Sequence, residues 1–272
     1  MSFTIPPGRS KLSASSLALF QRSPKAFYWR HIHKLESAFQ SVGDFSHDRI
    51  CGSVFAAFVD RFYKGMSEAE NTALMLKEWQ EQTDGWVPEK INAKYVETMS
   101  TWATTYYQEF SKDDGVRNGS EKLVENDRFL GYLDGLSHDG LTIHEVKTCS
   151  RSKQLSEQLL KFQTSTQVKL YAVLTRATGV VIELAFKDSP VAIYRAERYS
   201  FTKEQVAIWE QELNALADAI YALGDDPHNY TCTPESCSIL TKNFTSICAY
   251  QPLCLMGLTD ETKIAYKPKA KR

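Results

Sequence analysis

The chain has 272 residues, of which 43% are hydrophobic and 12% aromatic, so it can bury a substantial core in one large domain or two small ones. Its 32 basic and 33 acidic residues give a formal net charge of −1, which indicates no polyanionic partner for the surface as a whole. No apolar run approaches the roughly 20 residues of a membrane span, and residues 1–11 lack the pattern of a secretory signal. We therefore expect a soluble cytoplasmic protein without a membrane partner.

The N-terminal part of the sequence carries the pattern of several helices. Residues 17–32 have apolar side chains at helical spacing, broken once at Ser23-Pro24, where a serine N-cap and a first-turn proline restart the helix. A second helix is expected after Gly52, and Ser67-Glu68-Ala69-Glu70 is a capping-box sequence that opens a third. Pro88 should begin a fourth helix.

From residue 121 onward the pattern changes to short strands that alternate with helices. This order predicts an α/β fold in which a mixed central β-sheet is flanked by helices. We expect a single domain over residues 1–272, with a helical N-terminal region (1–115), a sheet-containing core (121–223) and a cysteine-rich C-terminal segment (224–272). The expected elements are an antiparallel meander of strands at 122–129, 130–136 and 141–148, a helix at 153–178, strands at 180–186 and 191–199, and a helix at 202–223.

Three residues in the meander have the chemistry of a hydrolytic metal site. If residues 130–136 form a strand, Asp134 shares a face with Tyr132, and Glu145 and Lys147 share a face of the next strand. Two neighbouring carboxylates favour a cation between them, and hard oxygen ligands suit Mg²⁺ or Mn²⁺. A lysine beside the metal can orient or deprotonate water and stabilise charge on a phosphate. Taken alone, Glu145-x-Lys147 is far more typical of a surface pair on an ordinary amphipathic strand than of a catalytic site, and it decides nothing.

The cysteines indicate a second centre. Six cysteines in a reducing compartment are poor candidates for disulfides, and clustering favours a metal or an iron–sulfur centre. The alternative is that they are unliganded core residues, since free cysteines pack as apolar side chains. The clustered residues are Cys232, Cys237, Cys248 and Cys254.

The order and spacing of these segments resemble the PD-(D/E)XK nuclease superfamily in its RecB-like branch. The segments that carry the resemblance are Gly131-Tyr132-Leu133-Asp134, then Ile143-His144-Glu145-Val146-Lys147-Thr148, then Gln167-Val168-Lys169-Leu170-Tyr171, together with the opening residues 12–28 and the C-terminal stretch 248–254. The resemblance implies a restriction-endonuclease-like core with Asp134, Glu145 and Val146 as metal ligands and Lys147 as the catalytic lysine. It also implies that Gln167 and Tyr171, one helical turn apart, position DNA or water.

The same resemblance implies a function. We expect a Mg²⁺- or Mn²⁺-dependent deoxyribonuclease with DNA as its partner. Because the branch often works in end processing, repair and recombination, an exonuclease acting on single strands or duplex ends is the favoured form. The resemblance also implies a 4Fe-4S cluster that clamps the C-terminal segment, with zinc as the alternative because both centres accept four thiolates.

Two positions depart from the branch. A metal-binding histidine usually follows the Gly52 motif, and Ala56 stands there instead; Asp60 could supply an acid or be an ordinary solvated residue. The loss of the histidine motivates an alternative function, a catalytically weak or inactive DNA-binding or assembly subunit that keeps the nuclease fold. Ser23 stands where cluster-containing members carry an early cysteine, which leaves Cys232 or Cys51 as the fourth cluster ligand.

Overall fold

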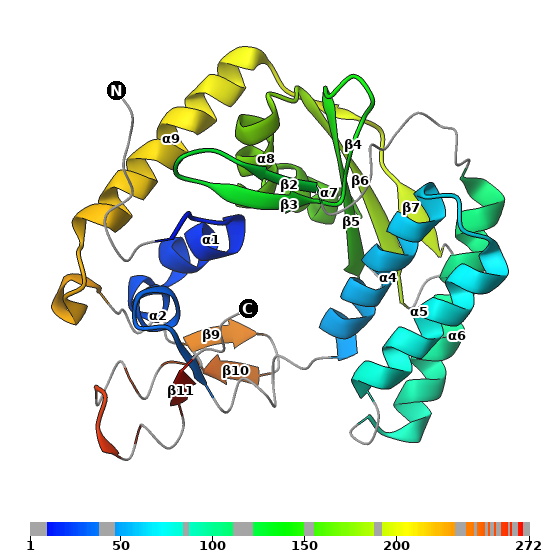
Figure 1. Ribbon diagram of the computed structural model, residues 1–272, viewed down its shortest axis with the longest axis horizontal. Helices are drawn as coiled ribbons and strands as arrows, with labels where there is room; N and C mark the ends of the chain where they lie inside the picture. Colours follow the sequence, from blue (N-terminus) through cyan, green and yellow to red (C-terminus); the bar gives the residue numbers. More distant parts are fainter. Residues whose placement is uncertain are drawn as a thin grey trace. The chain divides into compact units, whose positions relative to one another are not determined.

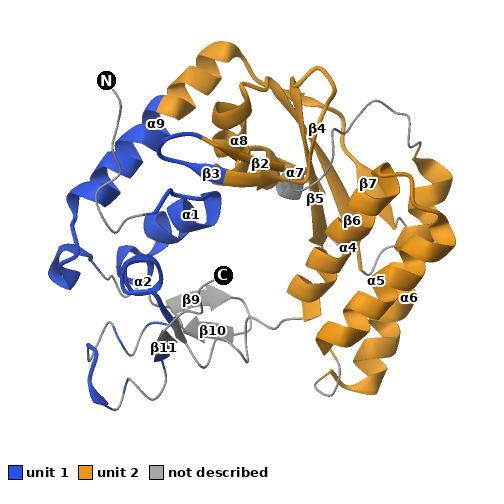
Figure 2. Ribbon diagram, viewed as in Figure 1, with its two compact units in different colours: residues 1–45, 126–130, 211–272 blue, residues 46–125, 131–210 orange. Residues whose placement is uncertain are grey.

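The computed structural model describes residues 10–37, 47–83, 87–110, 122–149, 155–187 and 192–231, with shorter stretches between residues 238 and 268. These residues form two compact units (Figure 2). Unit 1 comprises Met1–Phe45, Asn126–Leu130 and Gln211–Arg272, and unit 2 comprises Ser46–Glu125 and Gly131–Glu210. Within the described part of the chain, no helix has the length and apolarity needed to cross a membrane.

Unit 1 joins the two ends of the chain. Ser23 caps the second helix by accepting a hydrogen bond from the Ala26 N–H at 3.3 Å, which confirms the predicted break at Ser23-Pro24. The sequence of the C-terminal segment shows no clear apolar periodicity. Part of the segment is nevertheless regular, because β1 pairs with β11 in an antiparallel ladder. The elements that lie wholly in this unit are α1 (Ala14–Arg22), α2 (Pro24–Phe27), the π-helix η1 (Tyr28–Ile32), β1 (Leu35–Ser37), the 3-10 helix η2 (Pro227–Asn229), β9 (Ser238–Thr241), β10 (Phe244–Ile247) and β11 (Tyr266–Pro268).

Unit 2 contains three helices around an aromatic core. These are α4 (His47–Tyr63), α5 (Glu68–Thr83) and α6 (Glu89–Glu109), and they confirm the three helices predicted there. Ser67 accepts a hydrogen bond from the Glu70 N–H at 3.4 Å, as its capping sequence predicts. The fully buried side chains of this core include Phe55, Phe58, Phe62, Trp79, Trp102 and Tyr106.

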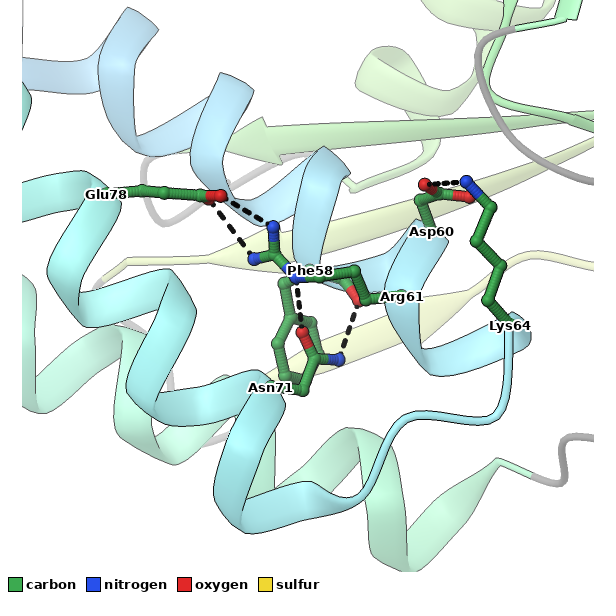
Figure 3. Close-up of polar contacts among 6 residues, drawn as sticks. All are labelled: Phe58, Asp60, Arg61, Lys64, Asn71 and Glu78. Carbon is green, nitrogen blue, oxygen red and sulfur yellow. Dashed lines mark hydrogen bonds and ion pairs between the residues drawn. The ribbon is translucent and has the colours of Figure 1, made fainter.

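A buried polar network ties α4 to α5 (Figure 3). Asn71 is fully buried, and its amide donates to the Phe58 carbonyl at 2.9 Å while its oxygen accepts from Arg61 Nε at 2.8 Å. The Arg61 guanidinium also binds both oxygens of the Glu78 carboxylate, at 2.7 and 3.2 Å. The polar groups of Asn71 are therefore paired inside an apolar core, which avoids the cost of burying them unsatisfied.

The sheet of unit 2 has the strand order β4-β5-β6-β7, and β8 pairs with β6 as well. β5 and β6 run parallel over eight residue pairs, from Thr142↔Gly179 to Cys149↔Phe186, whereas the other pairs are antiparallel. A parallel pair needs a crossover, which α7 and α8 supply (Figure 1). The elements are β4 (Gly135–Leu136), β5 (Thr142–Cys149), α7 (Leu155–Gln163), α8 (Thr166–Thr175), β6 (Gly179–Phe186), β7 (Ile193–Arg195), β8 (Tyr199–Ser200) and α9 (Lys203–Ala222).

The mixed sheet with flanking helices confirms the predicted fold class, but three predicted elements are divided. The strand expected at 130–136 breaks at Asp134 into β3 (Leu130–Leu133) and β4. β3 pairs with β2 (Lys122–Glu125) in a separate two-stranded sheet, so a single meander is wrong. The helix expected at 153–178 ends at Gln163, because Ser165 caps a new helix by accepting from the Val168 N–H at 3.3 Å. The strand expected at 191–199 divides into β7 and β8.

The Asn71 network gives a stability prediction. Replacing Asn71 by Ala opens a cavity and leaves Arg61 Nε and the Phe58 carbonyl without this partner, so we expect the free energy of unfolding to fall by about 2–3 kcal/mol in urea titrations followed by circular dichroism. The matched control is Lys64→Ala, which removes the ion pair between Asp60 of α4 and the exposed lysine just after that helix and should cost less than about 0.5 kcal/mol. Equal effects of the two substitutions would contradict this account of the network.

Candidate active site

Asp134 lies where the two sheets of unit 2 separate. The pairing of β4 with β5 consists of Gly135↔His144 and Leu136↔Ile143. Beyond His144, the Val146 N–H donates to Asp134 Oδ2 at 2.9 Å, so a carboxylate takes the place of a strand carbonyl at this edge of β5. The break in the predicted strand therefore places the acid against the motif that carries Glu145 and Lys147.

Glu145 and Lys147 form a close ion pair on one face of β5. Lys147 Nζ lies 2.5 Å from Glu145 Oε2 and 3.8 Å from Asp134 Oδ2. The Glu145 side chain is 1% exposed, whereas the side chains of Asp134 and Lys147 remain 23% and 25% exposed. The site thus has a buried carboxylate at its base and two charged groups that solvent can reach.

The electrostatic balance favours the charged form of Lys147. Burial alone would lower the pKa of its ammonium, but the carboxylates of Glu145 and Asp134 outweigh burial and hold that pKa above its ordinary value. The lysine therefore stays protonated at neutral pH in this arrangement. Two carboxylates thus share one ammonium in the cluster.

The donor set suits a hard divalent cation. Asp134 and Glu145 supply carboxylate oxygens, and Val146 can contribute only through its backbone carbonyl because its side chain has no donor atom. Among the described residues, no three His, Cys, Asp or Glu side chains gather into one group. A cation held here would complete its coordination with water, as Mg²⁺ commonly does.

Gln167 and Tyr171 lie on α8 beside this cluster, as their spacing predicts. Gln167 Nε2 donates to the Tyr171 hydroxyl at 3.2 Å, and that hydroxyl donates to the Tyr132 carbonyl at 2.7 Å. Burial, followed by the charge of Glu145, raises the pKa of Tyr171 to about 12. Tyr171 therefore remains a neutral hydrogen-bond donor that fixes the strand leading into Asp134.

Gly131 permits this contact, a role that the sequence analysis missed. A Cβ at Gly131 would lie 2.4 Å from Cε1 of the Tyr171 ring, closer than two carbon atoms that are not bonded to each other can approach. A glycine inside a strand pattern is a signal of such a close approach, and it was available in the sequence.

A second buried carboxylate, Glu183 of β6, shows a different pattern. Tyr106 donates to its Oε2 at 2.7 Å, and Arg195 Nε lies 3.1 Å from its Oε1. Both oxygens thus have protein partners of their own in the helical core. Glu183 lies in a structural ion pair, whereas at Glu145 a second carboxylate, that of Asp134, approaches the same lysine.

The comparisons with known proteins decide the family. The family model described as the PD-(D/E)XK nuclease superfamily matches residues 11–255.

The chain belongs to the PD-(D/E)XK nuclease superfamily.

No curated protein matches the chain. A solved structure of a phage-related exonuclease from Haemophilus somnus 129PT is 12% identical to this nuclease-superfamily chain and aligns with a TM-score of 0.33. The alignment covers 63% of this chain and 92% of that one. At this TM-score the likeness carries no argument about function.

Helix α4, in which Ala56 replaces the expected histidine, covers the face of the sheet opposite to Glu145 and Lys147. Val146, whose side chain alternates with those of Glu145 and Lys147, packs in the core of α4, α5 and α6. α4 approaches β5 closely at Gly52, where a Cβ would lie 3.1 Å from Thr148 Oγ1. Asp60 of α4 accepts a hydrogen bond at 2.7 Å from Lys64, which directly follows that helix, so Asp60 is held in an ion pair (Figure 3).

The predicted cluster ligands Cys232, Cys237, Cys248 and Cys254 lie outside the described residues. Cys51, the alternative fourth ligand, is fully buried in the helical core, and burial raises the pKa of its thiol to about 12. Its thiolate, the form that binds metal, is therefore disfavoured where the structure places it.

The contact between Gly131 and Tyr171 predicts that the effect of Gly131→Ala on the free energy of unfolding depends on whether the Tyr171 ring is present. Gly131→Ala should lower the free energy of unfolding by about 1–3 kcal/mol, because the tyrosine ring or the strand must move. In a Tyr171→Ala background the same substitution should be neutral or stabilising, since alanine suits a strand interior better than glycine. The measurement is a double-mutant cycle of urea unfolding. Tyr171→Phe is the control background, because it keeps the ring and should keep the penalty.

Proposed function

We propose that the protein is a metal-dependent deoxyribonuclease that hydrolyses phosphodiester bonds at Asp134, Glu145 and Lys147. The observation that carries the proposal is the junction of Lys147 Nζ with both carboxylates, at 2.5 and 3.8 Å, in a chain of the PD-(D/E)XK nuclease superfamily. The superfamily supports DNA as the substrate class. Mg²⁺ or Mn²⁺ is the proposed ion because the donor atoms are oxygens.

Each residue has a role that follows from its place. Asp134, Glu145 and the Val146 carbonyl would hold the ion, which when bound supplies Lewis-acid activation of water and of the scissile phosphate. Lys147, a quarter exposed, can donate a hydrogen bond to a phosphate oxygen and stabilise the charge that develops there. Gln167 and Tyr171 would position the DNA or the attacking water.

The mode of cleavage is part of the same proposal. We propose an exonuclease that acts on single strands or duplex ends in DNA repair or recombination, on the strength of the sequence resemblance to the RecB-like branch. We also propose that residues 1–272 act as one nuclease domain with its core at 121–223. The cytoplasmic location stays a prediction.

One observation favours a second candidate function. Ala56 stands where the branch usually carries a metal-binding histidine, and an alanine side chain cannot bind metal. A catalytically weak or inactive DNA-binding subunit would keep the fold and bind DNA without cutting it. The cleavage assay below separates the two candidates.

Cleavage is tested with end-labelled single- and double-stranded DNA. We expect cleavage in Mg²⁺ or Mn²⁺ and none in EDTA, and a fall in kcat of at least about 100-fold for Lys147→Ala, Asp134→Asn and Glu145→Gln, because each substitution removes charge from the site.

Lys64→Ala is the control, because it removes an exposed lysine that follows α4 and is not part of the site. Unfolding curves of the three site variants establish that they remain folded. Wild-type cutting rates in those variants would refute the site, and wild-type DNA binding without any cutting would favour the inactive subunit.

We further propose that Cys232, Cys237, Cys248 and Cys254 hold a 4Fe-4S cluster that clamps the C-terminal segment. The support is their clustering in the sequence and the resemblance to the RecB-like branch. Four thiolates can hold such a cluster or a zinc ion, and binding of either contributes to folding.

The expected result is a brown, anaerobically purified protein that contains iron and acid-labile sulfide. Cys232→Ser should bleach the visible absorption, whereas Cys149→Ser, which changes a buried free cysteine, should leave it unchanged. Colourless protein with stoichiometric zinc would replace the cluster by a zinc site. Protein with neither metal would leave these four residues as unliganded cysteines.

A further inference from the structure

Tyr132 stands out among the exposed apolar side chains. Its exposed fraction is 57%, and the other large hydrophobic side chains that the described residues expose are all aliphatic. Within the described part of the chain, its ring contacts no other ring and its hydroxyl makes no hydrogen bond. Tyr132 therefore presents an unused aromatic face to solvent.

The backbone beneath this ring is held firmly. The Tyr132 carbonyl accepts the Tyr171 hydroxyl at 2.7 Å, and Tyr171 in turn accepts from Gln167. The neighbours on either side face inward, since Gly131 lies against the Tyr171 ring and Leu133 is fully buried. An aromatic side chain with two rotatable angles on a fixed strand loses little entropy when it binds a flat partner.

Tyr132 lies close to the acidic cluster in the sequence, on the strand that ends just before Asp134. Tyr132 precedes Asp134 by two residues, a separation of about 7 Å between Cα atoms in extended chain. Asp134 accepts the Val146 N–H at 2.9 Å, which joins this segment to the strand that carries Glu145 and Lys147. We expect a DNA strand whose phosphate lies at this cluster to carry a base within reach of Tyr132.

We propose that Tyr132 is a specificity-determining residue, which stacks on the base next to the scissile phosphate and selects DNA in which that base is unpaired. The proposal rests on the proposed nuclease function and names its substrate class. Bases inside a duplex are stacked on both faces, whereas an unpaired base can offer a face to an aromatic side chain. Stacking of this kind tolerates any sequence, because every base has a π face.

Binding is measured first, separately from cleavage. The full chain with Lys147→Ala in Mg²⁺ binds a fluorescent oligothymidylate, and anisotropy gives the Kd. Adding Tyr132→Ala or Tyr132→Leu should raise that Kd about tenfold, whereas Tyr132→Phe should stay within about twofold. Ile208→Ala is the matched control, since it removes a side chain of similar exposure far from the site in sequence and should change nothing.

A substrate lacking one base tests the stacking itself. Oligothymidylates with single abasic sites are scanned, and one position should weaken binding to the Tyr132 protein about as much as Tyr132→Ala does. That penalty should vanish in Tyr132→Ala, because the ring and the base then have no contact to lose. Binding of a blunt duplex should change little, so the preference for single strands should shrink.

The outcomes separate this proposal from the one on which it rests. Unchanged oligothymidylate binding in Tyr132→Ala, or an abasic penalty that persists in it, overturns the role of Tyr132 and leaves the nuclease function standing. Failure of the protein with Tyr132 intact to bind oligothymidylate also overturns the role of Tyr132, and the nuclease function then stands or falls with the cleavage assay on duplex DNA.

Discussion

The ion pair between Lys147 and Glu145 is the interaction on which the site depends. A carboxylate that is 1% exposed needs a partner of opposite charge, since isolated buried charge is unstable. Lys147 provides that charge from the same strand, two residues away, so no distant element has to close for the pair to form. Asp134 joins from the neighbouring chain segment through the Val146 N–H.

The packing around the pair explains why the cluster stays accessible. The α4, α5 and α6 core covers the face of β5 that carries Val146, and α8 approaches the face that carries Glu145 through Tyr171. Gly131 lets that tyrosine come close without displacing the strand. The contrast with Glu183, whose oxygens bind Tyr106 and Arg195, shows how the same kind of residue becomes purely structural when its partners are complete.

Strong local signals in the sequence predicted most of the fold. Serine caps and helical spacing predicted α2, α5 and α6, and the alternation of strands and helices predicted a mixed sheet. The break at Asp134 was missed because a carboxylate that bonds a neighbouring strand leaves no mark on the local pattern. The break at Ser165 was missed although a serine cap is a recognised signal, because apolar spacing continues across it.

For the candidate site, the sequence predicted which residues lie together better than it predicted how the chain brings them together. The motif order proposed Asp134, Glu145, Lys147, Gln167 and Tyr171, and the structure places these side chains together. The roles of Gly131 and of the Tyr132 carbonyl depend on a contact between segments 40 residues apart, which spacing alone cannot reveal. The order of residues in β5 also has a genetic consequence. Insertion or deletion of one residue in this strand would exchange Val146 with its charged neighbours, expelling an apolar side chain from the core and burying a charge there. Selection for a stable core would therefore disfavour such a change of register in β5, and would keep Glu145 and Lys147 on the face opposite Val146.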